Sequence, residues 1–145
     1  MDKLEYIPGD LVMVDNDIVK VMTRSVNYFL KIINNYDVMF HSGNVYKYSP
    51  NELKPIPLTP EILEKNGWKK EVMSRGVKNS HWVYTKPDIE EYGYFPIYIE
   101  KGIGDEFDVY PFTGNNVCNQ IAYIKYVHQL QHLLFGLGLN SEMEV

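Results

Sequence analysis

Two histidines near the C-terminus have the spacing of metal ligands. His128 and His132 stand four positions apart, so on a helix their imidazoles lie one turn apart. In zinc hydrolases with this spacing, a glutamate follows the first histidine and takes the proton from the metal-bound water. Gln129 occupies that position here, and an amide cannot accept this proton. The pair therefore does not predict a metallohydrolase, and we assign no catalytic residue.

A metal site without catalysis needs only ligands, so metal binding through this pair remains an alternative. The ammonium group of Lys125, three positions before His128, opposes a dication there. Nothing in the sequence fixes a third ligand. We therefore expect neither a bound metal nor a cofactor. The candidates for a third ligand are His41, His81, Asp105, Glu106 and Asp108.

A helical wheel separates the residues around this pair into an apolar and a polar side. The apolar side holds Leu130, Leu134 and their neighbours, while both histidines fall opposite and are predicted to face solvent. The polar side also carries apolar residues, which predicts that something covers it. The simpler interpretation is that the N-terminal module or the C-terminal tail packs there, and the alternative is a partner or a second copy. The predicted partner-facing surface consists of Ile121, Lys125, His128, Gln129, His132 and Phe135.

The remaining motifs that could support catalysis or ligand binding are incomplete. Cys118 lies among asparagines, but no base is close to it in sequence. Gly102 and Gly104 are not followed by a phosphate-binding pattern, so they predict a turn. The acidic residues between positions 100 and 108 are typical of a solvated loop.

The composition limits the classes of function. The 145 residues are 45% hydrophobic and 23% charged, which is typical of a globular chain. A net charge of −5 opposes non-specific binding to nucleic acid. One cysteine allows no intrachain disulfide, and the first residues lack the pattern of a signal peptide. We expect a cytoplasmic protein without a membrane anchor.

The N-terminal third has the pattern of a small β-barrel. Short strand-like runs are separated by turn residues such as Asn and Gly. Five short strands in about fifty residues predict an SH3-like barrel over residues 1–57. Such barrels contact peptides or RNA, so nucleic-acid binding through this module is a second alternative. The predicted strands are residues 11–14, 18–22, 28–33, 38–40 and 45–48.

A proline-rich stretch at residues 49–60 predicts the boundary of this module. Thr59, Pro60 and Gly67 then specify the start and end of a short helix over residues 60–66. We predict strands at 68–72, 81–85, 95–100 and 107–112, followed by a helix over 121–137. The predicted fold class is therefore α+β, with residues 58–145 forming a helix, an antiparallel meander and a C-terminal helix.

Two stretches carry a resemblance to known sequences. LKPIPLTPEILEKNGW at 53–68 and IKYVHQLQ at 124–131 resemble a group of small uncharacterised proteins from gut Bacteroidetes genomes, phages and mobile elements. That group often has Asn where this chain has His132, so the resemblance implies no site with two histidines. It also implies no activity, because no function is established for the group.

These observations together favour a binding protein over an enzyme. We expect a non-enzymatic cytoplasmic accessory protein of a phage or mobile element that binds a macromolecular partner. The expected partner is another protein or a second copy of the chain. Metal binding through the two histidines and nucleic-acid binding through the barrel are the alternatives.

Overall fold

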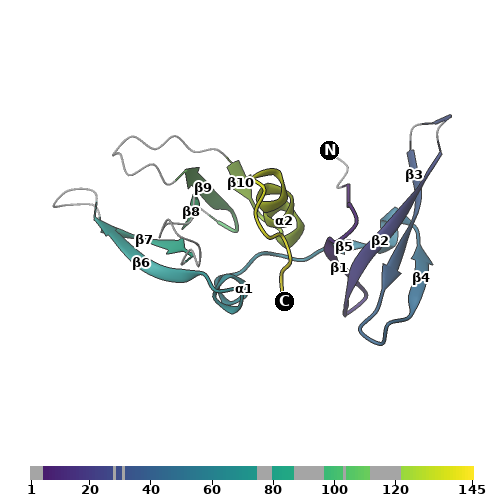
Figure 1. Ribbon diagram of the computed structural model, residues 1–145, viewed down its shortest axis with the longest axis horizontal. Helices are drawn as coiled ribbons and strands as arrows, with labels where there is room; N and C mark the ends of the chain where they lie inside the picture. Colours follow the sequence, from purple (N-terminus) through teal and green to yellow (C-terminus); the bar gives the residue numbers. More distant parts are fainter. Residues whose placement is uncertain are drawn as a thin grey trace. The chain divides into compact units, whose positions relative to one another are not determined.

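The computed structural model describes residues 5–27, 29–30, 32–74, 80–86, 97–102, 104–111 and 122–145. The chain forms two compact units (Figure 1). Unit 1 combines Met1–Pro57 with Tyr126–Met143, and unit 2 combines Leu58–Lys125 with Glu144–Val145. Each unit contains one five-stranded antiparallel sheet.

The sheet of unit 1 follows the chain as a meander until its last strand. Each consecutive pair is antiparallel, and the fifth strand then pairs with the first. The order across the sheet is β4-β3-β2-β1-β5. A single 3-10 turn, Pro50–Glu52, precedes the last strand. The strands are β1 (Leu11–Val14), β2 (Asp17–Asn27), β3 (Ile32–Met39), β4 (Val45–Tyr48) and β5 (Lys54–Pro55).

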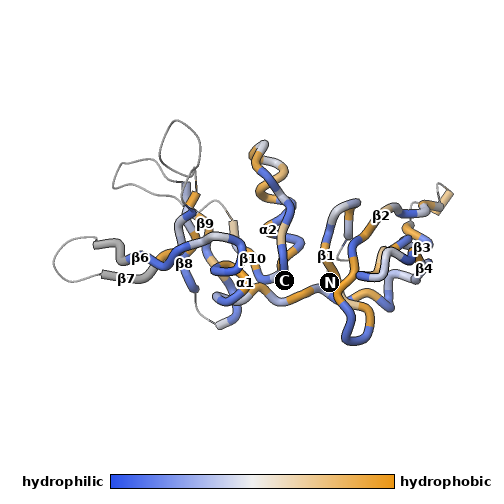
Figure 2. Tube along the Cα trace, turned by 60° about the horizontal axis from the view of Figure 1, so that its bottom comes forward, coloured by the Kyte–Doolittle hydropathy of each residue, from blue (hydrophilic) through white to orange (hydrophobic). Residues whose placement is uncertain are grey.

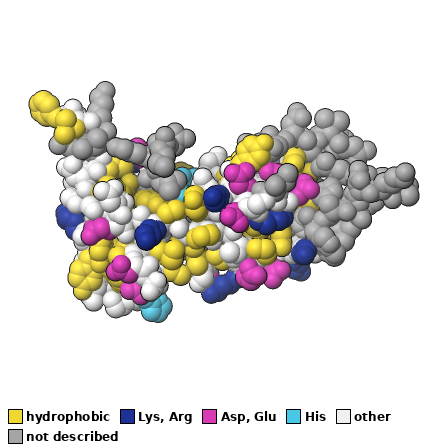
Figure 3. Space-filling model, turned by 180° about the vertical axis from the view of Figure 1, so that it is seen from behind, with side chains coloured by type: hydrophobic (Ala, Val, Ile, Leu, Met, Phe, Trp, Pro, Cys, Tyr) yellow, Lys and Arg dark blue, Asp and Glu magenta, His cyan; other side chains and the backbone are white. Residues whose placement is uncertain are grey.

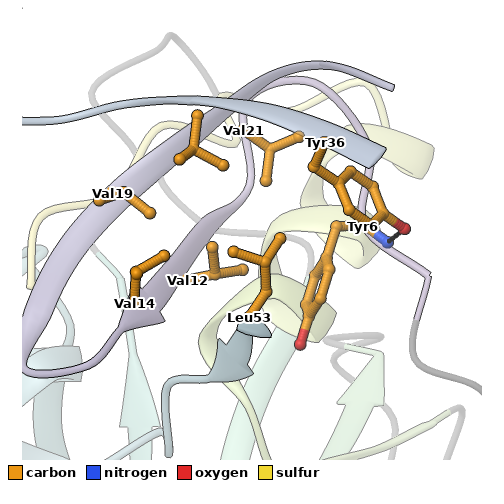
Figure 4. Close-up of a cluster of buried hydrophobic side chains, with 8 residues drawn as sticks. Tyr6, Val12, Val14, Val19, Val21, Tyr36 and Leu53 are labelled. Atoms are coloured by element: carbon orange, nitrogen blue, oxygen red, sulfur yellow. Dashed lines mark hydrogen bonds between the residues drawn. The ribbon is translucent and has the colours of Figure 1, made fainter. Parts of the chain in front are cut away.

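The core of unit 1 lies on one face of this sheet because alternate side chains of a strand point the same way. Val12 pairs with Val19 in the neighbouring strand, and both are fully buried. Tyr6 packs edge-on against Tyr36, and its backbone N–H donates to the Tyr36 hydroxyl at 3.2 Å. Figure 4 shows these side chains pointing toward one another. The buried cluster contains Tyr6, Val12, Val14, Val19, Val21, Tyr36, Val38 and Leu53.

The predicted SH3-like barrel is wrong, because the sheet is not closed. β4 and β5 lie at its two edges, and no pairing joins them in the described part of the chain. β5 has two residues, and prolines occupy positions 55 and 57. Since proline has no N–H to donate to a ladder, this segment cannot extend into a strand long enough for closure.

The sheet of unit 2 is also a meander, with the order β10-β9-β8-β7-β6. A short helix, α1 (Pro60–Lys65), precedes it, and the side chain of Thr59 caps this helix by accepting from the N–H of Ile62 at 3.2 Å. The positive φ of 88° at Gly67 ends the helix, so the predicted short helix is confirmed. The strands are β6 (Lys69–Ser74), β7 (Ser80–Thr85), β8 (Ile97–Lys101), β9 (Phe107–Pro111) and β10 (Ala122–Ile124).

The second helix, α2 (Val127–Gly136), is shorter than the predicted helix over 121–137. Residues 122–124 form β10 instead, and Tyr126 has extended backbone angles before the first helical turn. Both hydrophobic and hydrophilic residues occur along α2 (Figure 2). With two short helices and two antiparallel sheets, the described chain is mostly β, and the predicted α+β class is wrong.

Helix α2 belongs to unit 1, whereas we placed it in the segment 58–145. The N–H of Val127 donates to the carbonyl of Ile56 at 2.9 Å, and Pro57 forms an antiparallel bridge with Tyr126. The proline-rich stretch thus ends unit 1 at Pro57, and the chain returns to the same unit at Tyr126. Among the described residues, no helix combines the length and the apolar character needed to cross a membrane.

Candidate functional site

The first turn of α2 gives Gln129 a structural role. Its side-chain oxygen accepts a hydrogen bond from the N–H of Tyr126 at 3.0 Å. Because the first N–H groups of a helix have no partner inside the helix, a side-chain acceptor here stabilises the helix start. The residue at the position of a hydrolase glutamate is therefore a helix cap.

His128 is buried, contrary to the prediction from the helical wheel. Its exposed fraction is 2%, and its Nδ1 has no hydrogen-bond partner among the described residues. Its ring lies edge-on to Tyr6, with centroids 5.0 Å apart, and stacks on Tyr126 at 5.8 Å. Burial, and then repulsion from His132, lowers the pKa of His128 to about 4, so the imidazole is neutral at pH 7.

His132 is held by a buried carboxylate. Its Nε2 lies 2.7 Å from Oδ2 of Asp10, which also accepts from the N–H of Ile7 at 2.8 Å. Asp10 is 2% exposed, whereas the side chain of His132 is 35% exposed. Burial raises the pKa of Asp10, and the hydrogen bonds from Ile7 and His132 offset part of that rise.

Gln131 connects α2 to two other segments of unit 1. Its side-chain oxygen accepts from the N–H of Leu11 at 3.0 Å. Its side-chain nitrogen donates to the carbonyl of Gly9 at 3.1 Å and to that of Ser141 at 3.2 Å. The N-terminal segment and the C-terminal tail therefore both contact α2 through Gln131. We refer to Tyr6, Asp10, His128, Gln131 and His132 as the α2 cluster.

Sequence reasoning missed Asp10 and Gln131. Asp10 follows a Pro-Gly pair and looks like a turn residue, while Gln131 lies between the two histidines and looks like part of a polar face. Both are buried, at 2% and 4% exposure. No local signal marks them as buried, because the contacts that join the N-terminal segment to α2 link residues about 120 positions apart in the chain.

The α2 cluster has the contacts of a structural site. Each hydrogen bond of Asp10 and Gln131 holds α2 or the segment beside it. The hydroxyl of Tyr6 is buried without a described partner, and burial raises the pKa of Tyr6 to about 12. No group of three or more ligating side chains that can hold a metal ion occurs among the described residues.

The other predicted ligands differ in exposure. His41, Asp105 and Glu106 are exposed, and Asp108 is half-buried on β9. The side chains of His81 and Cys118 lie outside the described residues.

The predicted partner-facing surface has mixed exposure. Lys125 and Phe135 are exposed, Phe135 to 69%. Gln129 and His132 are half-buried, and each makes a contact within its own chain. His128 is buried, and Ile121 lies outside the described residues.

Among the described residues, the most exposed large apolar side chain, Phe29, lies at the end of the β2–β3 hairpin, next to Leu30. Phe29 is 99% exposed and Leu30 is 66% exposed. Figure 3 shows hydrophobic side chains that project from the surface. We call Phe29 and Leu30 the hairpin tip. Sequence reasoning placed both inside a strand over residues 28–33, because neither residue is typical of turns.

The far edge of the same sheet carries a second group of exposed apolar residues. Val45 and Tyr46 of β4 are each 52% exposed. The ring of Phe40 lies edge-on to Tyr46, with centroids 5.4 Å apart, and lies 6.1 Å from Tyr48. Among the described residues, β4 pairs with β3 on one side only, so its other side is an edge of the described sheet.

Comparison with known proteins found no matching family model, no matching curated protein and no matching solved structure.

Proposed function

We propose that this chain is a non-enzymatic accessory protein that binds a protein partner through the hairpin tip of unit 1. The observation that carries the proposal is the exposure of Phe29, at 99%, with Leu30 beside it at 66%. Burying a side chain of this size releases about 2–3 kcal/mol. Large exposed apolar groups on a protein surface mark interaction sites.

The position of the tip supports this proposal. Ser25 to Asn27 of β2 pair with residues of β3 that lie beyond those paired with β4, and β1 pairs with β2 only as far as Lys20. The hairpin therefore extends past the rest of its sheet (Figure 1). A projecting aromatic side chain fits the geometry of an anchor that fills a pocket on a partner.

The stem of the hairpin has polar contacts on one face, while Tyr36 belongs to the core and Ile33 packs against it. Thr23 donates to Asp37 at 2.8 Å, and Arg24 lies 4.0 Å from Glu5. Met22 is 39% exposed in the bulge that precedes this stem. Neither Phe29 nor Leu30 belongs to the core cluster of unit 1.

The resemblance at residues 53–68 and 124–131 supports a proposal about the biological setting of this chain. We propose that the chain serves a phage or mobile element in the host cytoplasm. The two alternatives have less support. The net charge of −5 opposes nucleic-acid binding, and the two histidines are used in packing α2.

The test is site-specific photo-cross-linking in cells that naturally express the chain, with a photoreactive phenylalanine at position 29. We expect one protein to be cross-linked and to be lost from affinity captures with Phe29→Ser/Leu30→Ser. The loss should exceed about tenfold, as for an interface anchor.

The matched control is Phe135→Ser, which removes a phenylalanine that is 69% exposed on α2. This variant should capture the same partner as the wild type. Equal capture by all three proteins, or a photoreactive tip that cross-links nothing, would refute the proposal.

A further inference from the structure

The backbone of β4 has a defined set of groups at its free edge. In the β3–β4 turn, the N–H of Phe40 donates to Asn44 and the N–H of Gly43 donates to Phe40, both at 2.9 Å. Gly43 has φ of 88°, so this is a hairpin turn with a one-residue bulge at Gly43. Antiparallel pairs alternate between hydrogen-bonded and non-hydrogen-bonded positions. Phe40 and Asn44 form a hydrogen-bonded pair, so the positions two and four residues after Asn44 are hydrogen-bonded as well. The backbone groups of Tyr46 and Tyr48 therefore face β3.

It follows that the N–H and C=O groups of Val45 and Lys47 face away from β3. Their positions opposite Met39 and Asp37 are the non-hydrogen-bonded ones. A strand added at this edge therefore bonds to Val45 and Lys47, and its side chains continue both faces of the sheet.

We propose that the strand added there is β4 of a second copy, in an antiparallel two-fold pair centred on Tyr46. Val45 of each copy then lies opposite Lys47 of the other, and the outward groups of both residues form about four hydrogen bonds. Tyr46 lies opposite Tyr46 of the second copy at a non-hydrogen-bonded position, where side chains are closest. The interface is isologous, as expected for a two-fold dimer.

The neighbouring antiparallel registers are less favourable. Centring the pair on Lys47 places two ammonium groups opposite each other, which is unfavourable. Centring it on Val45 places Lys47 opposite Gly43, whose positive φ of 88° is incompatible with an extended strand. If the two-fold axis passes between Tyr46 and Lys47, Tyr46 of one copy lies opposite Lys47 of the other. The core face of one sheet then continues into the outer face of the second sheet, which is unfavourable.

The side chains of β4 fit this pairing. Tyr46 lies on the core side of the sheet, opposite Val38, which is fully buried, yet Tyr46 is 52% exposed. A second Tyr46 continues the aromatic group formed by Phe40, Tyr46 and Tyr48. A lysine on an edge strand usually opposes pairing, but Lys47 lies 3.7 Å from Asp37 of its own sheet.

The first test is disulfide cross-linking in the full chain with Cys118→Ser, so that each introduced cysteine is the only one. Tyr46→Cys should form a covalent dimer under mild oxidation, because the two cysteines lie directly opposite. Val45→Cys and Lys47→Cys are the matched controls, and both should cross-link at least about tenfold more slowly, since neither lies opposite its own copy.

The second test is sedimentation of the unmodified chain. We expect a monomer–dimer equilibrium that Val45→Pro abolishes and Val45→Thr preserves, because proline removes an N–H that is not used within the sheet. A monomer at all concentrations up to about 0.5 mM, or equal cross-linking at the three positions, would overturn this inference. The Phe29→Ser/Leu30→Ser variant should still dimerise, so failure of the proposed partner binding is a separate result.

Discussion

At the residue scale, the α2 cluster shows how burial changes the role of ionisable side chains. His128 is neutral because its environment is apolar and because His132 is close, with ring centroids 5.5 Å apart. Asp10 keeps a charge-assisted contact with His132 inside the unit, and its second hydrogen bond fixes the backbone at Ile7. Histidine and aspartate side chains often act in catalysis, but the contacts of these residues stabilise the packing of α2 within unit 1.

The pKa of His128 predicts a loss of stability in acid. Its folded value of about 4 lies below the ordinary 6.5, so folding favours the neutral form. The stabilisation is complete above pH 6.5 and is lost as the pH falls toward 4, by about 3 kcal/mol in total. Urea unfolding between pH 7.5 and 4 measures this loss.

The non-titrating variant His128→Phe should lose most of this pH dependence, whereas His41→Gln, at an exposed histidine, should keep it. An unchanged pH profile in His128→Phe would show that another group causes the acid sensitivity.

Removing the carboxylate of Asp10 should cost more than removing an exposed one. Asp10→Ala leaves the N–H of Ile7 and the ring of His132 without their acceptor, and we expect a loss of about 2–4 kcal/mol in the free energy of unfolding. Asp37→Ala, which breaks a surface contact with Lys47, should cost less than about 1 kcal/mol. Chemical denaturation of both variants at pH 7 tests this difference, and equal losses would contradict it.

At the scale of elements, helix α2 is held by polar contacts as well as by its apolar side. Leu130 and Leu134 supply buried apolar surface, and Gln131 supplies three hydrogen bonds to backbone groups of two segments. Because α2 has only ten residues, its own hydrogen bonds do not stabilise it in isolation. Its order depends on docking against β1 and the segment before it.

Two glutamines in α2 should therefore respond differently to substitution. Gln131→Ala leaves the N–H of Leu11 without its acceptor and should lower stability by about 2–3 kcal/mol. Gln129→Ala removes a helix cap and should cost about 1 kcal/mol. Hydrogen exchange should show faster opening of α2 and of Leu11 in Gln131→Ala only, and similar exchange in both variants would argue against this assignment.

At the scale of the whole molecule, unit 1 consists of two chain segments separated by unit 2. Pro57 and Tyr126, which border the intervening segment, form an antiparallel bridge and are therefore close in space. Ends this close are typical of a segment inserted into a compact unit.

This arrangement predicts that unit 2 can be removed. A chain that joins Pro57 to Tyr126 through a short glycine linker should fold cooperatively, because it retains the sheet and α2. Residues 1–57 alone should not, because they lack α2 and its contacts with Asp10, Leu11 and Gly9. Thermal unfolding and amide NMR spectra of the two chains provide the comparison, and a cooperative transition in residues 1–57 would refute it.

The sequence by itself determined the features that depend on neighbouring residues. The strands at 11–14 and 45–48 and the short helix capped by Thr59 follow from local alternation and capping chemistry. The tertiary structure alone decided that the first sheet stays open, that α2 joins unit 1, and that His128 is buried while the hairpin tip is exposed. The physical reason is the distance along the chain: Leu11 and Gln131 are 120 positions apart, and no local pattern specifies which surface covers a helix.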